Sequence, residues 1–216
     1  MISIASIVEG EGEVEALPVL LRRLHEWRPG PAYPNPLRPI RVKRNRFLNR
    51  EDEFRRMLLL AKKQCGENGW LLILLDADDD CPVSLAAGIA KRAKEYIQHV
   101  RLSVVLAKRE YEAWFIAAAR SLDGIRGFHC PNELGTDPES KRDAKGWIST
   151  HMTSRSYGEV LDQSAFSARF DLQLAFDNSR SNFARSGKSI SHIWMEIERG
   201  IPDRRHVYGQ LGAPDS

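Results

Sequence analysis

Apolar positions in the first 120 residues alternate between strand-like and helix-like patterns. Residues 2–8 alternate and are rich in β-branched side chains, which predicts a strand. From Glu13 the apolar residues recur every three or four positions, as in a helix with one buried face. Residues 70–75 and 102–107 are continuous apolar runs, typical of strands that are buried on both faces. Such alternation predicts an α/β fold with a parallel, Rossmann-like sheet of about four strands flanked by helices.

The segments between these strands have helical or loop patterns. Residues 51–65, 83–99 and 111–120 have helical spacing, and residues 39–43 are compatible with a short strand. The repeated prolines of residues 29–36 predict a loop, and residues 76–82 predict another.

The pattern weakens after residue 120. Residues 121–146 are rich in Gly, Pro, Asp and Lys and predict a loop. Short helical patterns follow within residues 155–200, at 157–166 and 190–199. We therefore expect an α/β domain over residues 1–120. Residues 121–216 would form a mainly helical or irregular C-terminal extension packed on it.

Composition excludes several classes of protein. Apolar residues make up 42% of the chain and charged residues 28%, as in ordinary globular domains. The three cysteines are widely spaced, which indicates neither a disulfide framework nor a four-cysteine zinc site. The N-terminal residues lack a signal-peptide pattern, and no apolar run approaches the ~20 residues of a membrane span. We expect a cytoplasmic protein that makes no membrane contact.

Carboxylates follow three of the predicted strands: Glu9 and Glu13, then Asp76 and Asp78, then Glu110 and Glu112. Because the carboxyl ends of parallel strands meet at one sheet edge, these side chains are expected to converge. Crowded carboxylates repel one another, and a cation such as Mg²⁺ (or Mn²⁺), which takes oxygen ligands, would offset that repulsion. Each acid alone has another explanation, because acids are common near helix N-termini and in turns.

Two segments carry a resemblance to a known superfamily. Ile7-Val8-Glu9-Gly10 together with Leu74-Leu75-Asp76-Ala77-Asp78 resembles the toprim pattern, in which one strand ends in Glu-Gly and a later one in Asp-x-Asp. This resemblance covers residues 2–115. The Glu9-x-x-x-Glu13 spacing is similar to that of toprim domains in overcoming-lysogenization-defect (OLD) nucleases. Residues 107–115 and 179–183 resemble DUF4276, a bacterial family of small toprim-like proteins, and this resemblance implies action beside an ATPase.

The resemblance implies a role for each matching acid. Glu9 would be the general acid/base or a metal ligand, and Asp76 and Asp78 would be metal ligands. Glu13 would bind a second ion. Two further acids complete the predicted metal set: Asp80 and Glu112, with Glu110 as the rival of Glu112. Nothing corresponds to the strand-breaking tyrosine domain of a topoisomerase or to the zinc motif of a primase.

Basic residues form three groups that could contact phosphate. Residues 38–50 form the first group, in which Phe47 could stack on a base. The candidate nucleic-acid contacts are Arg41, Lys43, Arg44, Arg46, Arg180 and Arg185. Lys141, Arg142 and Lys145 are candidates for phosphate contact or for stabilising a charged transition state. Each group is also compatible with an ordinary solvated surface.

These observations favour a Mg²⁺-dependent nuclease that hydrolyses nucleic-acid phosphodiester bonds, with DNA favoured over RNA. The resemblance further implies an ATPase partner and a defence role against phage. The alternative is a non-catalytic toprim-like subunit of an ATPase complex, since a fold alone does not guarantee chemistry. A third possibility is a haloacid-dehalogenase phosphatase, because Asp76-Ala77-Asp78 resembles its nucleophile motif. That motif normally lies on the first strand, which disfavours it here.

Overall fold

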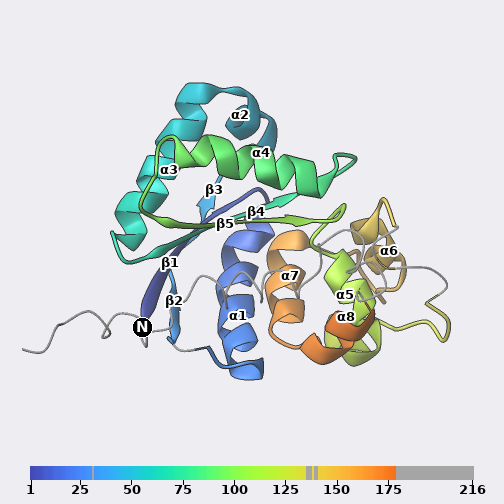
Figure 1. Cartoon of the computed structure of the whole chain (residues 1–216). Coiled ribbons are helices and arrows are strands. Elements are labelled where there is room, and N and C mark those ends of the chain that lie inside the picture. The colour runs from blue at the N-terminus through green and yellow to red at the C-terminus, as the bar shows by residue number, and fades with distance from the viewer. Residues whose placement is uncertain (31, 135–137, 139–140, 179–216) are drawn as a thin grey trace, which may run out of the picture.

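The computed structural model describes residues 1–178 apart from 31, 135–137 and 139–140, and it shows three layers (Figure 1). A parallel sheet forms the middle layer. The helices α2 (Arg44–Asn49), α3 (Glu51–Cys65) and α4 (Pro82–Lys94) cover one face. The other face is covered by α1 (Glu11–Trp27), α5 (Ala113–Ala117), α6 (Ala144–Thr150), α7 (Glu159–Ser167) and α8 (Leu172–Asn178).

The sheet has five strands, all parallel. The strand β1 (Ile2–Val8) lies beside β4 (Trp70–Asp76), which in turn pairs with β5 (Arg101–Ala107). On its other side, β1 pairs with two short strands, β2 (Pro34–Pro36) near its start and β3 (Ile40–Arg41) at its end. The predicted α/β fold with a parallel sheet of about four strands flanked by helices is therefore confirmed.

The strand register aligns the carboxyl ends of the three long strands. Ile7 lies opposite Ile73, and Asp76 lies opposite Ala107. Residues that follow β1, β4 and β5 therefore emerge at the same edge of the sheet, where ligands bind in open parallel sheets.

Each face of the sheet contributes to its own hydrophobic core. Alternate residues of β1 and β4, such as Ile4 and Leu72, pack with α1 and the helices beside it. The intervening residues, such as Ile7 and Ile73, pack with α3 and α4. Continuous apolar strands are thus explained by helices on both faces.

Several predicted element boundaries are wrong. The predicted loop 29–36 contains β2, whose prolines are tolerated because an edge strand needs hydrogen bonds on one side only. The predicted helix 83–99 ends at Lys94, and the predicted helix 111–120 is reduced to α5 plus a 3₁₀ helix (Ala119–Leu122). The predicted loop 121–146 contains a second 3₁₀ helix (Ile125–Gly127) and the start of α6. Residues 190–199 lie outside the described part.

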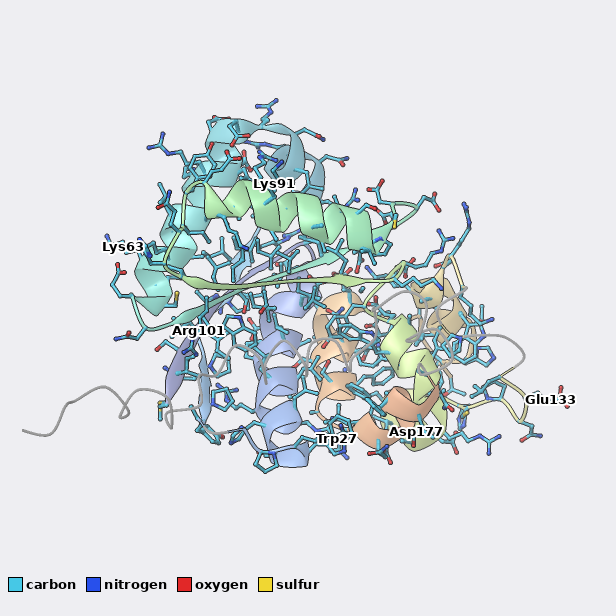
Figure 2. All side chains as sticks on the ribbon, viewed as in Figure 1. Trp27, Lys63, Lys91, Arg101, Glu133 and Asp177 are labelled. Atoms are coloured by element: carbon cyan, nitrogen blue, oxygen red, sulfur yellow. The ribbon has the colours of Figure 1, made fainter. Side chains whose placement is uncertain are left out.

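The C-terminal helices pack on the core of α1 and α5. Phe115 of α5 meets Phe166 and Phe170, with ring centroids 5.5 and 5.4 Å apart. At the far end of this layer, Trp27 of α1 meets Phe176 of α8 at 5.8 Å, and Trp27 and Asp177 lie close together in Figure 2. One core thus spans residues before and after 120, and the domain boundary near 121 stays a prediction. Within the described residues, every helix is too short or too polar to traverse a bilayer.

Two glycines at the start of α1 allow α7 to approach closely. A Cβ on Gly10 would collide with the carboxylate of Glu159. A Cβ on Gly12 would lie 2.6 Å from the backbone oxygen of Glu159 and would also collide with the Gln163 side chain. Gly12, which faces backbone atoms of α7, is therefore needed for the close packing that brings α7 against α1.

We expect Gly12→Ala to lower the free energy of unfolding by about 1–3 kcal/mol, because the new methyl group overpacks a backbone contact. The matched control is Gly88→Ala in the middle of α4, where a Cβ would meet nothing within 4 Å. That control is expected to gain about 0.5–1 kcal/mol from the higher helix propensity of alanine. Urea unfolding of both variants measures whether each substitution lowers or raises the free energy of unfolding. Equal stability of Gly12→Ala and the wild type would contradict the close packing of α1 and α7.

Candidate active site at the carboxyl edge of the sheet

A cleft of about 350 Å³ opens at the carboxyl ends of β1 and β4. Its wall is mostly polar and combines acids from three separate parts of the chain. The lining residues are Glu9, Gly10, Glu11, Glu13, Arg41, Asp76, Lys145, Glu159 and Val160. The structure thus brings predicted site residues Glu9, Glu13, Asp76 and Lys145 together in one cavity.

Glu9 follows β1 and carries an unsatisfied oxygen. Its Oε2 atom is buried and has no hydrogen-bond partner among the described residues. Burial raises the pKa of Glu9, and the nearby Asp78 raises it further, while Arg44 and Lys145 act in the opposite direction. A buried acceptor without a partner is unfavourable unless a donor or a cation reaches it.

Glu13 closes the turn between β1 and α1. Its Oε2 atom accepts hydrogen bonds from the backbone N–H groups of Glu9 (3.0 Å) and Gly10 (3.1 Å). Burial raises the pKa of Glu13 to about 7, against the pull of these two N–H groups. Glu13 therefore caps the N-terminus of α1, which is the alternative role that the sequence left open for an acid near a helix start. Its role as a ligand of a second ion stays a prediction.

Asp76 is the last residue of β4. Its Oδ1 atom accepts a hydrogen bond of 3.1 Å from the backbone N–H of Tyr111. Burial raises the pKa of Asp76 well above its ordinary value, and the carboxylates of Glu13 and Glu112 add to that effect. The carboxyl group of Asp76 is thus close enough to Glu13 and Glu112, two other predicted ligands, for their charges to affect its pKa.

The loop after Asp76 is held by Arg44 and by Arg109, whose guanidinium donates to the Asp78 carbonyl (3.3 Å). Arg44 donates to the Asp76 carbonyl (3.1 Å) and pairs with both Asp78 (3.5 Å) and Asp80. Asp78 is exposed and has a left-handed backbone (φ 48°), a conformation that non-glycine residues rarely adopt. Asp80 lines a groove between α2 and α4 instead of the cleft. The structure therefore places Asp78 in an adjoining pocket, close enough to Glu9 to affect its pKa, and Asp80 away from the other predicted ligands.

The two rival acids after β5 occupy different places. Glu112 is fully buried, and its Oε1 atom accepts from the Tyr157 hydroxyl (3.0 Å) and from Gln163 Nε2 (3.3 Å). Its Oε2 atom has no partner among the described residues. Burial raises the pKa of Glu112 to about 7, although Lys145 lowers it. Glu110 instead accepts from the backbone N–H of Lys145 (3.2 Å) and lines a smaller neighbouring pocket.

Of the two candidate lysines, the structure places only Lys145 in the cleft. Its Nζ atom lies 3.1 Å from Glu159 Oε2. Burial alone would lower the pKa of Lys145, but Glu112 and Glu159 raise it above its ordinary value, so the side chain is an ammonium ion. Lys141 lies elsewhere, with its Nζ atom 5.5 Å from the centre of the Trp147 ring.

The predicted nucleic-acid contacts are mostly engaged within the chain. Arg41 pairs with Glu11 (3.2 Å) at the mouth of the cleft, and Arg46 pairs with Glu53 (2.6 Å). Lys43 is exposed and forms no ion pair with a described residue. Arg44 is occupied by the loop after Asp76, and Arg180 and Arg185 lie outside the described residues. The idea that Phe47 stacks on a base is wrong, because its ring is fully buried against Phe54.

Two site residues, Glu159 and Arg109, were not predicted from the sequence. Glu159 lines the cleft from the start of α7. Arg109 and the candidate Arg142 both pair with Asp79 in the pocket beside the cleft, Arg142 at 3.1 Å. The only sequence signal for Glu159 was an acid that begins a helical pattern, which is common. Arg109 has a left-handed backbone (φ 72°), which no sequence pattern indicated.

The donor set fits a hydrated magnesium ion better than a closed metal cage. No group of three or more Asp, Glu, His or Cys side chains in the described residues is arranged to hold a metal ion directly. Mg²⁺, however, keeps several waters and commonly uses one or two carboxylates. Glu9, with its unpartnered oxygen, and Asp76 line a cleft that has room for such waters.

Comparison with known proteins gives one assignment. The chain has no significant match among curated proteins or solved structures. The model of the family described as "Domain of unknown function (DUF4276)" matches residues 8–185 of the 216. This match includes the Glu9-Gly10 pair that directly follows β1, the acidic end of β4, α6 and α7. The chain therefore belongs to the DUF4276 family.

Proposed function

We propose that the chain is a Mg²⁺- or Mn²⁺-dependent nuclease that hydrolyses phosphodiester bonds at this cleft, with a toprim-like site of the kind also found in OLD nucleases. One observation carries the proposal: Glu9 and Asp76, from two neighbouring parallel strands, share a single cleft with an ammonium ion. Acids at the ends of parallel strands together with a nearby lysine suit a reaction on a phosphate, which needs both cation binding and charge stabilisation.

Glu9 and Asp76 would hold the metal ion, with Asp78, from the adjoining pocket, as a further ligand. Bound there, Mg²⁺ would supply charge neutralisation and a more acidic water. Glu9 is also suited to accept a proton, because burial raises its pKa towards the pH at which general bases work best. Lys145 would donate hydrogen bonds to the phosphate oxygens as their negative charge grows.

Arginines around the cleft could hold the rest of the polyanion. Arg41 lies at its mouth, and Arg109 and Arg142 converge on Asp79 in an adjoining pocket of about 110 Å³. Asp79 is exposed, so a substrate phosphate could exchange for its carboxylate at low cost. DNA is favoured over RNA as substrate.

A second candidate is a non-catalytic subunit beside an ATPase. The observation in its favour is that Arg41, Arg44 and Arg46 are already paired with carboxylates of the chain. The ATPase partner, the bacterial defence role and the cytoplasmic location rest on the family resemblance and on composition, and they stay predictions.

The proposal is tested by incubating the purified chain with plasmid DNA, single-stranded DNA and RNA. We expect cleavage in Mg²⁺ or Mn²⁺, none in EDTA, and recovery when excess metal is returned. A chain that cuts none of the three substrates in either metal, but is recovered with an ATPase independently of metal, would support the non-catalytic alternative.

A further inference from the structure

Five carboxylates share the surroundings of one ammonium ion. Lys145 interacts electrostatically with Asp76, Glu112 and Glu159, and it influences the pKa of Glu9. Glu13 lines the same cleft. Among the described lining residues the only other cation is Arg41, which is paired at the rim with Glu11. The interior of the cleft thus depends on Lys145 for positive charge.

The backbone and the side chain of Lys145 are held to different extents. The backbone is fixed at the start of α6, where its N–H donates to Glu110 (3.2 Å) and the Asp143 cap accepts from the N–H of Gly146 (2.7 Å). Within the described part of the chain, the Nζ atom has one ion pair, with Glu159, and both side chains are partly exposed, at 38% and 30%. A single, partly solvated pair is weak, so the ammonium group can move without disturbing the helix.

We propose that Lys145 is the internal counter-ion of the cation site: Glu159 tethers its ammonium group among the carboxylates of the metal-free chain, and a divalent ion displaces it towards the phosphate. The inference rests on the metal site of the proposed function. It adds that the Lys145 ammonium group and the divalent ion compete for the same carboxylates. A lysine ammonium is a compact point charge on a flexible stem, which suits both positions. Glu159 is then a positioning residue, because it determines where the Lys145 ammonium group lies in the metal-free chain.

A purely structural role for the Lys145–Glu159 pair makes a different prediction. If the pair only joined α6 to α7, its removal would weaken packing and leave metal affinity unchanged or reduced. A competing counter-ion, in contrast, must lower metal affinity while it is present, because two cations cannot occupy the same set of carboxylates.

The test is the affinity for Mn²⁺, measured by titration calorimetry at pH 8 on Lys145→Met. We expect at least about tenfold tighter binding than wild type, together with a lower melting temperature before metal is added. Lys141→Met is the matched control, four residues earlier on the chain and outside the cleft, and its affinity should stay within about twofold of wild type. Lys145→Gln repeats the charge removal with a polar side chain, in case the methionine variant does not fold.

Each outcome decides between the two proposals. Mn²⁺ binding by a Lys145 variant that is no tighter than by Lys141→Met would overturn the counter-ion role while leaving the nuclease proposal standing. Tighter binding without any cleavage by the wild type would support the counter-ion role and count against the nuclease. Absence of Mn²⁺ binding in the wild type and in both Lys145 variants would remove the cation site, and both proposals with it.

Discussion

Asp76→Asn should reduce metal-dependent cleavage by about a thousandfold or more, equivalent to about 4 kcal/mol of lost transition-state stabilisation. Asparagine keeps the shape of the side chain and an oxygen that can accept from the backbone N–H of Tyr111, as Asp76 does at 3.1 Å. What it removes is the negative charge at the end of β4, on which cation binding depends. The rate of plasmid nicking in Mg²⁺, with folding checked by circular dichroism, measures the effect.

The same substitution should raise stability when no metal is present. Burial, Glu13 and Glu112 raise the pKa of Asp76, so the folded chain binds this proton more tightly than the unfolded chain. The stabilisation that Asp76 contributes is complete at pH values below its ordinary pKa of 3.8. It is lost as the pH rises through the higher pKa that Asp76 has in the folded chain. Asp76→Asn therefore melts above the wild type at pH 8 in EDTA. Asp52→Asn, an exposed first-turn acid of α3, should change neither property, and equal cleavage by Asp76→Asn and Asp52→Asn would refute the role of Asp76.

The parts of the fold and site that were predictable depend on periodic burial. Strands β4 and β5 were recognisable as apolar runs because helices cover both of their faces, and β1 was recognisable from its alternating, β-branched residues. The meeting of Glu9 with Asp76 followed from the rule that parallel strands end at one edge. That rule says nothing about strand order. The prediction also depended on β1 and β4 being neighbours in the sheet, which they are.

The part of the site that was not predicted comes from packing between distant segments. Glu159 lies at the start of α7, and the candidate Lys145 lies in α6, within a stretch whose Gly, Pro and Asp residues predicted only loop. Their position depends on α7 reaching Gly10 and Gly12 of α1, a contact between residues about 150 apart. Asp80 shows the limit of a local sequence motif, which placed it in the site, whereas the structure pairs it with Arg44 in a groove outside the cleft.

A buried ionic cluster fixes the segment that carries Glu159. Asp162 is inaccessible to solvent, and its carboxylate accepts four hydrogen bonds. The donors are Arg126 (2.6 Å), Arg155 twice (2.6 and 2.7 Å) and the backbone N–H of Gly158 (2.8 Å). Although burial would raise it, these donors hold the pKa of Asp162 at about 2, so the charge persists at every physiological pH. Gly158 directly precedes Glu159, so the cluster sets the start of α7.

Asp162→Ala is expected to lower the free energy of unfolding by about 3 kcal/mol, because it leaves the donors of two arginines and a backbone N–H unpaired. Half-exposure of the arginines, at 40% and 38%, keeps the loss near the lower end of the range for buried pairs. Urea unfolding measures it, with Asp177→Ala as the control, since Asp177 is exposed and, among the described residues, accepts only one hydrogen bond, from Gln173. A loss below about 1 kcal/mol would mean that the cluster does not anchor α7. In that case the position of Glu159 beside Lys145 must depend on the α1 glycines alone, and Gly12→Ala would be the more damaging substitution.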